Sequence, residues 1–108
     1  MYRQGDILIV PVSEDEVPRN LLGLPPAARD GRGRMVLALG EATGHAHALN
    51  CEGTLLRDPD PLAPDYLHLP AGGRLGHEEH AAISLPQGWY RVVRQREYVP
   101  GAVRVVAD

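Results

Sequence analysis

Four of the five histidines of this chain occur in two short clusters, and these clusters are its most specific chemical feature. The first cluster is Gly44-His45-Ala46-His47, and the second is His77-Glu78-Glu79-His80. Imidazole is a frequent ligand of transition metals, and it is the side chain that titrates closest to neutral pH. The two clusters therefore predict either a bound cation or a proton-sensitive site.

The residue types narrow the choice of metal. Three imidazoles, with or without a carboxylate, suit Zn²⁺, Fe²⁺, Ni²⁺ or Mn²⁺, whereas Ca²⁺ and Mg²⁺ prefer shells of oxygen. The candidate metal ligands are His45, His47, His77 and His80, and the additional candidates are Glu41, Glu79 and Cys51. If the site leaves one coordination position open, bound water is acidified, and Glu78 or Glu79 is then the candidate general base of an otherwise unknown reaction.

The alternation of side chains along a strand tests whether the first histidine pair points into the protein. On a straight strand, His45 and His47 lie on the same face. The same count places Leu37, Leu39 and Leu49 on that face, so it is the face expected to point into a core. We therefore expect both imidazoles to point inward.

The second cluster leaves two arrangements open. On a straight strand, His77 and Glu79 share one face, so His77 joins the first pair and His80 becomes an outer ligand. A bulge or a tight turn at Gly76 instead brings His77 and His80 to the same side. A further alternative is that such histidine pairs lie on exposed strands and bind nothing. The isolated His68 is expected to be structural.

Composition limits the function in other ways. All eleven basic residues are arginine, so lysine nucleophiles and Schiff bases are excluded within the chain. The net charge of −3 argues against a broad nucleic-acid surface, which makes nucleic acid an unexpected partner without excluding it. A single cysteine, Cys51, forms no intramolecular disulfide, and the chain has no secretion signal or membrane-spanning apolar stretch. We expect a cytoplasmic protein that does not enter a membrane.

The fold is predicted to be all-β. Short runs of β-type residues alternate with turns rich in proline and glycine, which indicates one domain over residues 1–108, a small barrel or sandwich of about six to eight short strands with long loops. Residues 18–34 contain Pro18, the Pro25-Pro26 pair and the turn sequence Asp30-Gly31-Arg32-Gly33, and we expect a mobile loop there. The expected strands are residues 5–12, 35–39, 43–50, 53–56, 66–69, 80–85, 89–99 and 102–107. Residues 53–56 are expected to return as a hairpin partner of residues 43–50, and Pro70 with Gly72-Gly73 is expected to close the strand over 66–69.

A polar row lies near the end of the longest predicted strand. Arg94, Arg96 and Tyr98 share one face there, and they would receive an anionic ligand or contact a partner. Cross-strand ion pairs are the alternative use of these arginines. The shortage of nucleophiles and the long proline-rich loops favour a second function, a non-enzymatic accessory or interaction module that binds a protein or nucleic-acid partner. It would dock through an edge strand or through the surface near Arg91, Arg94 and Arg96, and a homo-oligomer could form through the same edges.

Two resemblances follow from the motifs. The arrangement of Gln4-Gly5-Asp6, Thr43-Gly44-His45-Ala46-His47, His77-Glu78-Glu79-His80 and Gln95-Arg96-Glu97-Tyr98 resembles a family of small uncharacterised bacterial and phage proteins, over nearly the whole chain. This resemblance implies no activity. More distantly, His45-Ala46-His47 is similar to the first metal motif of cupins, in which two histidines, a following glutamate and a later histidine hold a divalent metal. It implies that His45 and His47, with His77 as the later histidine, bind metal.

The chain departs from the cupin pattern at the carboxylate. No glutamate follows His47 at the cupin spacing, because the next one, Glu52, is five residues further on. Glu41 or Glu79 would therefore have to supply the carboxylate.

Overall fold

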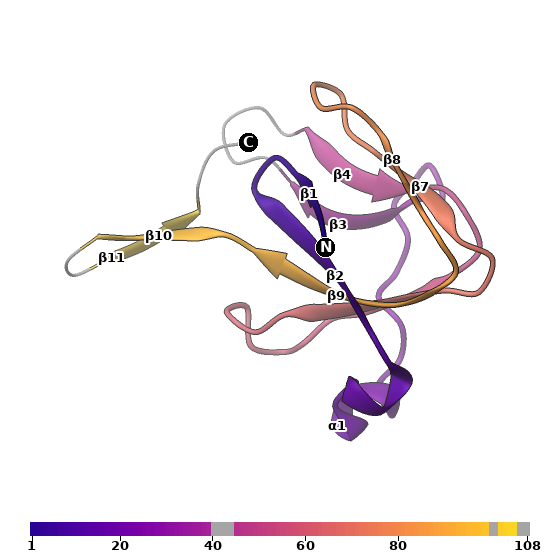
Figure 1. Cartoon of the computed structure of the whole chain (residues 1–108). Coiled ribbons are helices and arrows are strands. Elements are labelled where there is room, and N and C mark those ends of the chain that lie inside the picture. Colours follow the sequence, from indigo (N-terminus) through magenta and orange to yellow (C-terminus); the bar gives the residue numbers. More distant parts are fainter. Residues whose placement is uncertain (40–44, 100–101, 106–108) are drawn as a thin grey trace.

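The computed structural model describes residues 1–39, 45–99 and 102–105, with side chains described for residues 1–39 and 45–95. Within these residues the chain forms two antiparallel sheets and a separate hairpin (Figure 1). The predicted small all-β domain is confirmed. The described part of the chain contains eleven strands, more than the six to eight expected, because Tyr2–Gln4 and Gly73–Gly76 are additional strands and the run expected over residues 89–99 is two strands.

The larger sheet has five strands in the order β1-β2-β9-β6-β5. Their bounds are β1 Tyr2–Gln4, β2 Ile7–Val12, β5 Thr54–Leu56, β6 Asp65–Leu69 and β9 Gly88–Arg94. A two-residue turn at Gly5 and Asp6 joins β1 to β2, and Gly5 has a φ of 58°. Glycine tolerates this left-handed conformation without steric strain, which is why it suits so tight a turn.

The smaller sheet has four strands in the order β3-β4-β7-β8. Their bounds are β3 Met35–Leu39, β4 Ala46–Leu49, β7 Gly73–Gly76 and β8 Ile83–Leu85. Strand β4 runs antiparallel to β7, and Ala48 pairs with Gly76. The start of β4 therefore lies beside the end of β7.

The hydrophobic core lies between the two sheets, as in a sandwich. The five-stranded sheet contributes Ile7, Ile9, Leu55, Leu67, Leu69, Tyr90 and Val92, and the four-stranded sheet contributes Met35, Leu37, Ala38, Leu49, Leu75 and Leu85. All of these side chains are buried. Strand β2 has alternating burial because only one face of its sheet meets this core.

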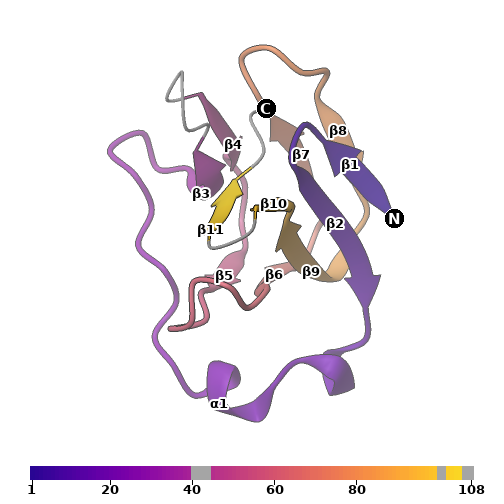
Figure 2. The ribbon, with the colours of Figure 1, turned by 90° about the vertical axis from the view of Figure 1, so that its left-hand side faces the viewer.

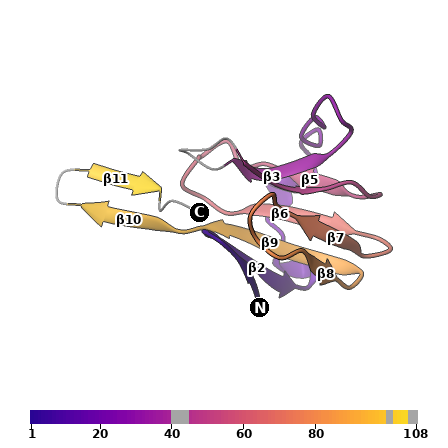
Figure 3. The same ribbon diagram turned by 90° about the horizontal axis from the view of Figure 1, so that it is seen from above.

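Two short helical turns and a hairpin complete the described chain. The 3-10 turn η1 spans Glu14–Glu16 and α1 spans Arg19–Leu22, so residues 18–34 contain a short helix that the sequence did not predict. Figure 2 shows α1 at the opposite end of the molecule from β4 and β7. Strands β10 (Arg96–Val99) and β11 (Ala102–Val105) form a hairpin that extends from the body beyond β9, as Figures 1 and 3 show. No helix in the described residues is long and apolar enough to cross a membrane.

Three expectations about strands are wrong. Thr54–Leu56 (β5) pairs with β6 in the larger sheet and not with the histidine strand β4. Gly73–Gly76 forms strand β7, although Gly72-Gly73 was expected only to close the preceding strand. Gln95 separates β9 from β10, so the single run expected over residues 89–99 is two strands.

The expected common face of Leu37 and Leu39 is also wrong. Leu37 is fully buried, whereas Leu39 is 63% exposed. The pairing of β3 with β4 is irregular between Val36 and Ala38. Such an irregularity reverses the alternation of side chains beyond it. The alternation counted from Leu37 therefore cannot be extended along the chain to the histidines.

Candidate metal centre

Three potential ligand groups meet where β4 begins and β7 ends. His45 directly precedes β4, and His77 and Glu78 directly follow β7. The antiparallel pairing of these two strands brings the three residues together across the sequence. One imidazole nitrogen from each histidine and one carboxylate oxygen of Glu78 all lie within 4.8 Å of one another. This grouping has the residue types and the size of a transition-metal site.

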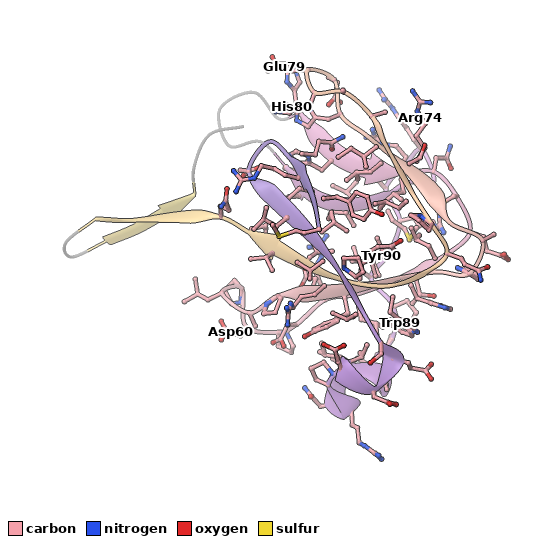
Figure 4. The ribbon with its side chains drawn as sticks, in the orientation of Figure 1. Asp60, Arg74, Glu79, His80, Trp89 and Tyr90 are labelled. Atoms are coloured by element: carbon pink, nitrogen blue, oxygen red, sulfur yellow. The ribbon has the colours of Figure 1, made fainter. Side chains whose placement is uncertain are left out.

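The second histidine cluster folds as a turn between β7 and β8. The backbone N–H groups of Glu79 and His80 point at Nδ1 of His77, at N···N distances of 3.0 and 3.3 Å. The ring centroids of His77 and His80 are 4.5 Å apart. The structure therefore has the turn arrangement and not the straight strand, and both histidines lie on the same side. Figure 4 shows Glu79 and His80 at this turn, remote from Trp89.

Glu78 connects this turn to the first histidine cluster. Its Oε2 accepts a hydrogen bond from the backbone N–H of Ala46, at 3.0 Å. The pKa of this carboxyl is lowered by hydrogen bonds from its own backbone N–H and from that of Ala46, and to a smaller extent by electrostatic interaction with His45 and His77. Glu78 is exposed and therefore offers an ionised oxygen to a cation.

Glu79 lies on the other side of His45. Its Oε1 is 3.3 Å from Nδ1 of His45, and the Glu79 side chain is 53% exposed. A carboxylate beside one imidazole nitrogen favours a proton on that nitrogen, so the other nitrogen keeps its lone pair for a metal. Glu79 therefore suits an orienting role at least as well as that of a direct ligand.

His47 is fully buried and is held by the turn between β1 and β2. Its Nδ1 lies 2.9 Å from Oε1 of Gln4, and its Nε2 lies 3.1 Å from Oδ1 of Asp6. The amide of Gln4 has a fixed orientation, because its Nε2 donates to the carbonyls of Leu75 and Ala81, each at 3.0 Å. Nδ1 of His47 must then be the donor to Gln4.

This network distinguishes His47 from the other histidines. With Nδ1 donating to Gln4, a second proton lies between Nε2 and Asp6, so both ring nitrogens of His47 already serve hydrogen bonds. To bind a metal, His47 would have to give up one of these two hydrogen bonds. The ring instead supports its neighbour, since its centroid is 4.3 Å from that of His77.

His80 adds an unsatisfied group to the cluster. Its Nε2 is buried and has no hydrogen-bond partner among the described residues. The His80 ring is stacked near His47, with centroids 6.1 Å apart and an interplanar angle of 12°. Buried polar atoms normally have a partner, so an ion or a water is the expected complement of this nitrogen.

The remaining predicted site residues lie apart from this cluster or outside the described region. Cys51 contacts the position of Gly73, at the far end of β7 from His77. Arg94 is at the end of β9, and the isolated His68 stacks on Trp89 at a centroid distance of 4.5 Å. Glu41 and the side chains of Arg96 and Tyr98 lie outside the residues that the structure describes.

A feature that the sequence analysis missed is a cleft of about 800 Å³ that opens beside Glu78. Its polar lining consists of four arginines and two carboxylates: Arg32, Arg34, Arg57, Arg94, Asp30 and Glu78. These arginines come from segments that are distant in sequence, so no local motif marks them. The roles of Gln4 and Asp6 as hydrogen-bond partners of His47 were also missed. The sequence Gln4-Gly5-Asp6, directly before an apolar strand, could have indicated a turn with two polar side chains.

Fold and site together define a small two-sheet β protein with a histidine and glutamate cluster at the ends of the two inner strands of one sheet. Residues 3–95 match the family described as a domain of unknown function (DUF8820), and the chain belongs to this family. No curated protein and no solved structure gives a significant match to the chain. The family supplies no activity, so the function has to be argued from the site.

Proposed function

We propose that this chain is a small cytoplasmic protein that binds one divalent transition metal through His45, His77 and Glu78. The observation that carries the proposal is the convergence of three ligand atoms within 4.8 Å from two separate parts of the sequence. Two imidazoles and a carboxylate form a ligand set used for Zn²⁺, Fe²⁺, Ni²⁺ and Mn²⁺. The fourth position is open to water or to His80, whose Nε2 is buried without a partner among the described residues.

Three contacts support this assignment over a set that includes His47. Glu79 beside Nδ1 of His45 favours a lone pair on the other nitrogen. Glu78 is held in position by the N–H of Ala46. The hydrogen bonds of His47 to Gln4 and Asp6 make it an anchor of the strand on which the site depends. The ligand set proposed here therefore differs from the cupin motif, which would use both histidines of the first pair.

Metal binding must compete with one local interaction. Two backbone N–H groups point at Nδ1 of His77, so in the neutral ring the proton resides on Nε2. A metal on Nδ1 displaces these two N–H groups, and a metal on Nε2 takes the place of that proton. We therefore expect the affinity for metal to fall as the pH decreases, because protons compete for the same lone pairs.

The test is metal binding by the whole chain, purified without an affinity tag and stripped with EDTA. Calorimetric titration with Zn²⁺ or Ni²⁺ should give about one site per chain, and a metal concentration of about 100 times Kd should stabilise the fold by about 2.7 kcal/mol. His45→Gln, His77→Gln and Glu78→Gln should each weaken binding at least tenfold.

Matched controls come from outside the cluster. His68→Gln removes an imidazole that stacks on Trp89, and Glu52→Gln removes an exposed carboxylate, so both variants should bind metal as the parent does. A His47 variant is not a useful test, because loss of its buried network would disturb the fold itself. The proposal is refuted if the stripped parent shows neither a heat of binding nor a thermal shift with any of the four metals.

A further inference from the structure

The arginine-lined cleft beside Glu78 carries more positive than negative charge. Four arginines line it together with Asp30 and Glu78. A third carboxylate, Asp65, lies behind it and is only 1% exposed. The four arginines therefore exceed the three carboxylates by one positive charge, in a chain with a net charge of −3. A metal on Glu78 would increase this excess.

Two of the arginines share the same buried carboxylate. Nη1 of Arg57 is 2.9 Å from Oδ2 of Asp65, and Nη2 of Arg94 is 3.6 Å from the same oxygen. Arg57 also donates to the carbonyls of Val36 and Leu37, which fixes its guanidinium at the wall of the cleft. One carboxylate cannot neutralise two guanidinium groups, so this part of the wall keeps a net positive charge at a fixed place.

The other two cleft arginines, Arg32 and Arg34, lie in the segment that directly precedes β3. Arg34 is paired with Asp30, at 2.9 Å, and is therefore neutralised locally. The guanidinium of Arg32 is exposed and has no hydrogen-bond or ion-pair partner among the described residues. The Arg32 guanidinium at the mouth of the cleft can therefore rotate and donate hydrogen bonds to a ligand that Arg57 and Arg94 attract.

We propose that this cleft binds a small molecule with an oxyanion group, a carboxylate or a phosphate, next to the candidate metal centre. Arg57 and Arg94 supply the fixed positive wall, and Arg32 supplies free donors in the fork geometry that matches oxyanions. The volume of about 800 Å³ lies within the range of small-molecule sites. Asp30 and Glu78 at the same cleft would repel a nucleic-acid backbone, which carries many charges. Only the position of the ligand beside a metal rests on the proposed function, whereas anion binding itself does not.

The test uses the whole chain stripped of metal, so that its outcome is independent of metal binding. Inorganic phosphate and succinate are titrated separately at low ionic strength, and backbone amide shifts are followed by NMR. Saturable shifts at residues that line the cleft are expected for at least one probe, and the stronger probe identifies the oxyanion. Binding should weaken as salt is added, because the attraction is electrostatic.

The variant Arg32→Gln should raise Kd about three- to tenfold, the effect of one charge-assisted contact at an exposed position. This residue pairs with no described side chain, so the variant should fold normally. Arg19→Gln is the matched control, because Arg19 is an exposed arginine in α1 at the other end of the molecule. Equal Kd values for the two variants would overturn the proposal, and so would the absence of saturable binding of both probes up to about 50 mM.

Discussion

The buried contacts of Gln4 should be worth several kcal/mol of stability, and Gln4→Met measures them. Gln4 is 2% exposed, accepts from His47 and donates to the carbonyls of Leu75 and Ala81. Methionine has nearly the same shape, so the substitution removes hydrogen bonds without opening a large cavity. It leaves three polar groups without their partner.

The size of the effect follows from the burial of those groups. His47 and Leu75 are fully buried, and each unsatisfied group there costs about 1–3 kcal/mol, whereas the carbonyl of the exposed Ala81 can turn to water. Burial of the methionine side chain returns about 1 kcal/mol. We therefore expect a loss of about 2–4 kcal/mol in the free energy of unfolding, with a melting temperature lower by roughly 10–25 °C.

Urea unfolding followed by the fluorescence of Trp89, the only tryptophan, gives this number directly. Gln87→Met is the matched control, because Gln87 is exposed in a turn and its loss should change stability by less than about 0.5 kcal/mol. If Gln4→Met also costs less than about 1 kcal/mol, the reasoning about the buried network is wrong.

Three further predictions concern the rest of the chain. Asp65→Asn removes a buried carboxylate that pairs with Arg57 at 2.9 Å, and it should cost about 1.5–3 kcal/mol in urea unfolding, because the charge-assisted hydrogen bond is lost while the partly exposed guanidinium stays in contact with water. Gly53→Ala places a Cβ 2.7 Å from the carbonyl oxygen of His68, which is backbone and cannot move aside, so thermal melting should show a loss of about 1–3 kcal/mol. Burial raises the pKa of Cys51, so at pH 7–8 it should react with a thiol reagent more slowly than free cysteine does, and faster only as the pH rises further.

The fold class could be predicted from the sequence because it depends on local signals. Alternating apolar residues and turns of proline and glycine mark strands such as Met35–Leu39 wherever they occur. The pairing of strands does not depend on local signals. Strand β7 contains two glycines and is recognisable only through its pairing with neighbouring strands. Strand β5 pairs with β6, and both strands bury leucine side chains in the core between the sheets.

The candidate site could be predicted only as far as residue types. The clustering of histidines marked the right segments, but it could not assign a role to each ring. His45 and His47 are two residues apart, yet the first lies near Glu78 and the second is buried against Gln4 and Asp6. That difference depends on a turn more than forty residues earlier in the sequence, and on the start of β4 at Ala46, which leaves His45 outside the strand.

The network around His47 explains how the site could be organised before any metal arrives. Gln4 ends β1 and Asp6 lies in the following turn of the five-stranded sheet, whereas His47 belongs to the four-stranded sheet. Their hydrogen bonds therefore tie the two sheets together near the strand ends where the ligands gather. Gln4 also holds strand β7 through the carbonyl of Leu75, two residues before His77. The strands that present the candidate ligands are therefore fixed by the protein's own contacts and by the apolar core between the sheets. A metal at this site would add stability to a chain that is already folded, unlike a zinc finger, which folds only around its ion.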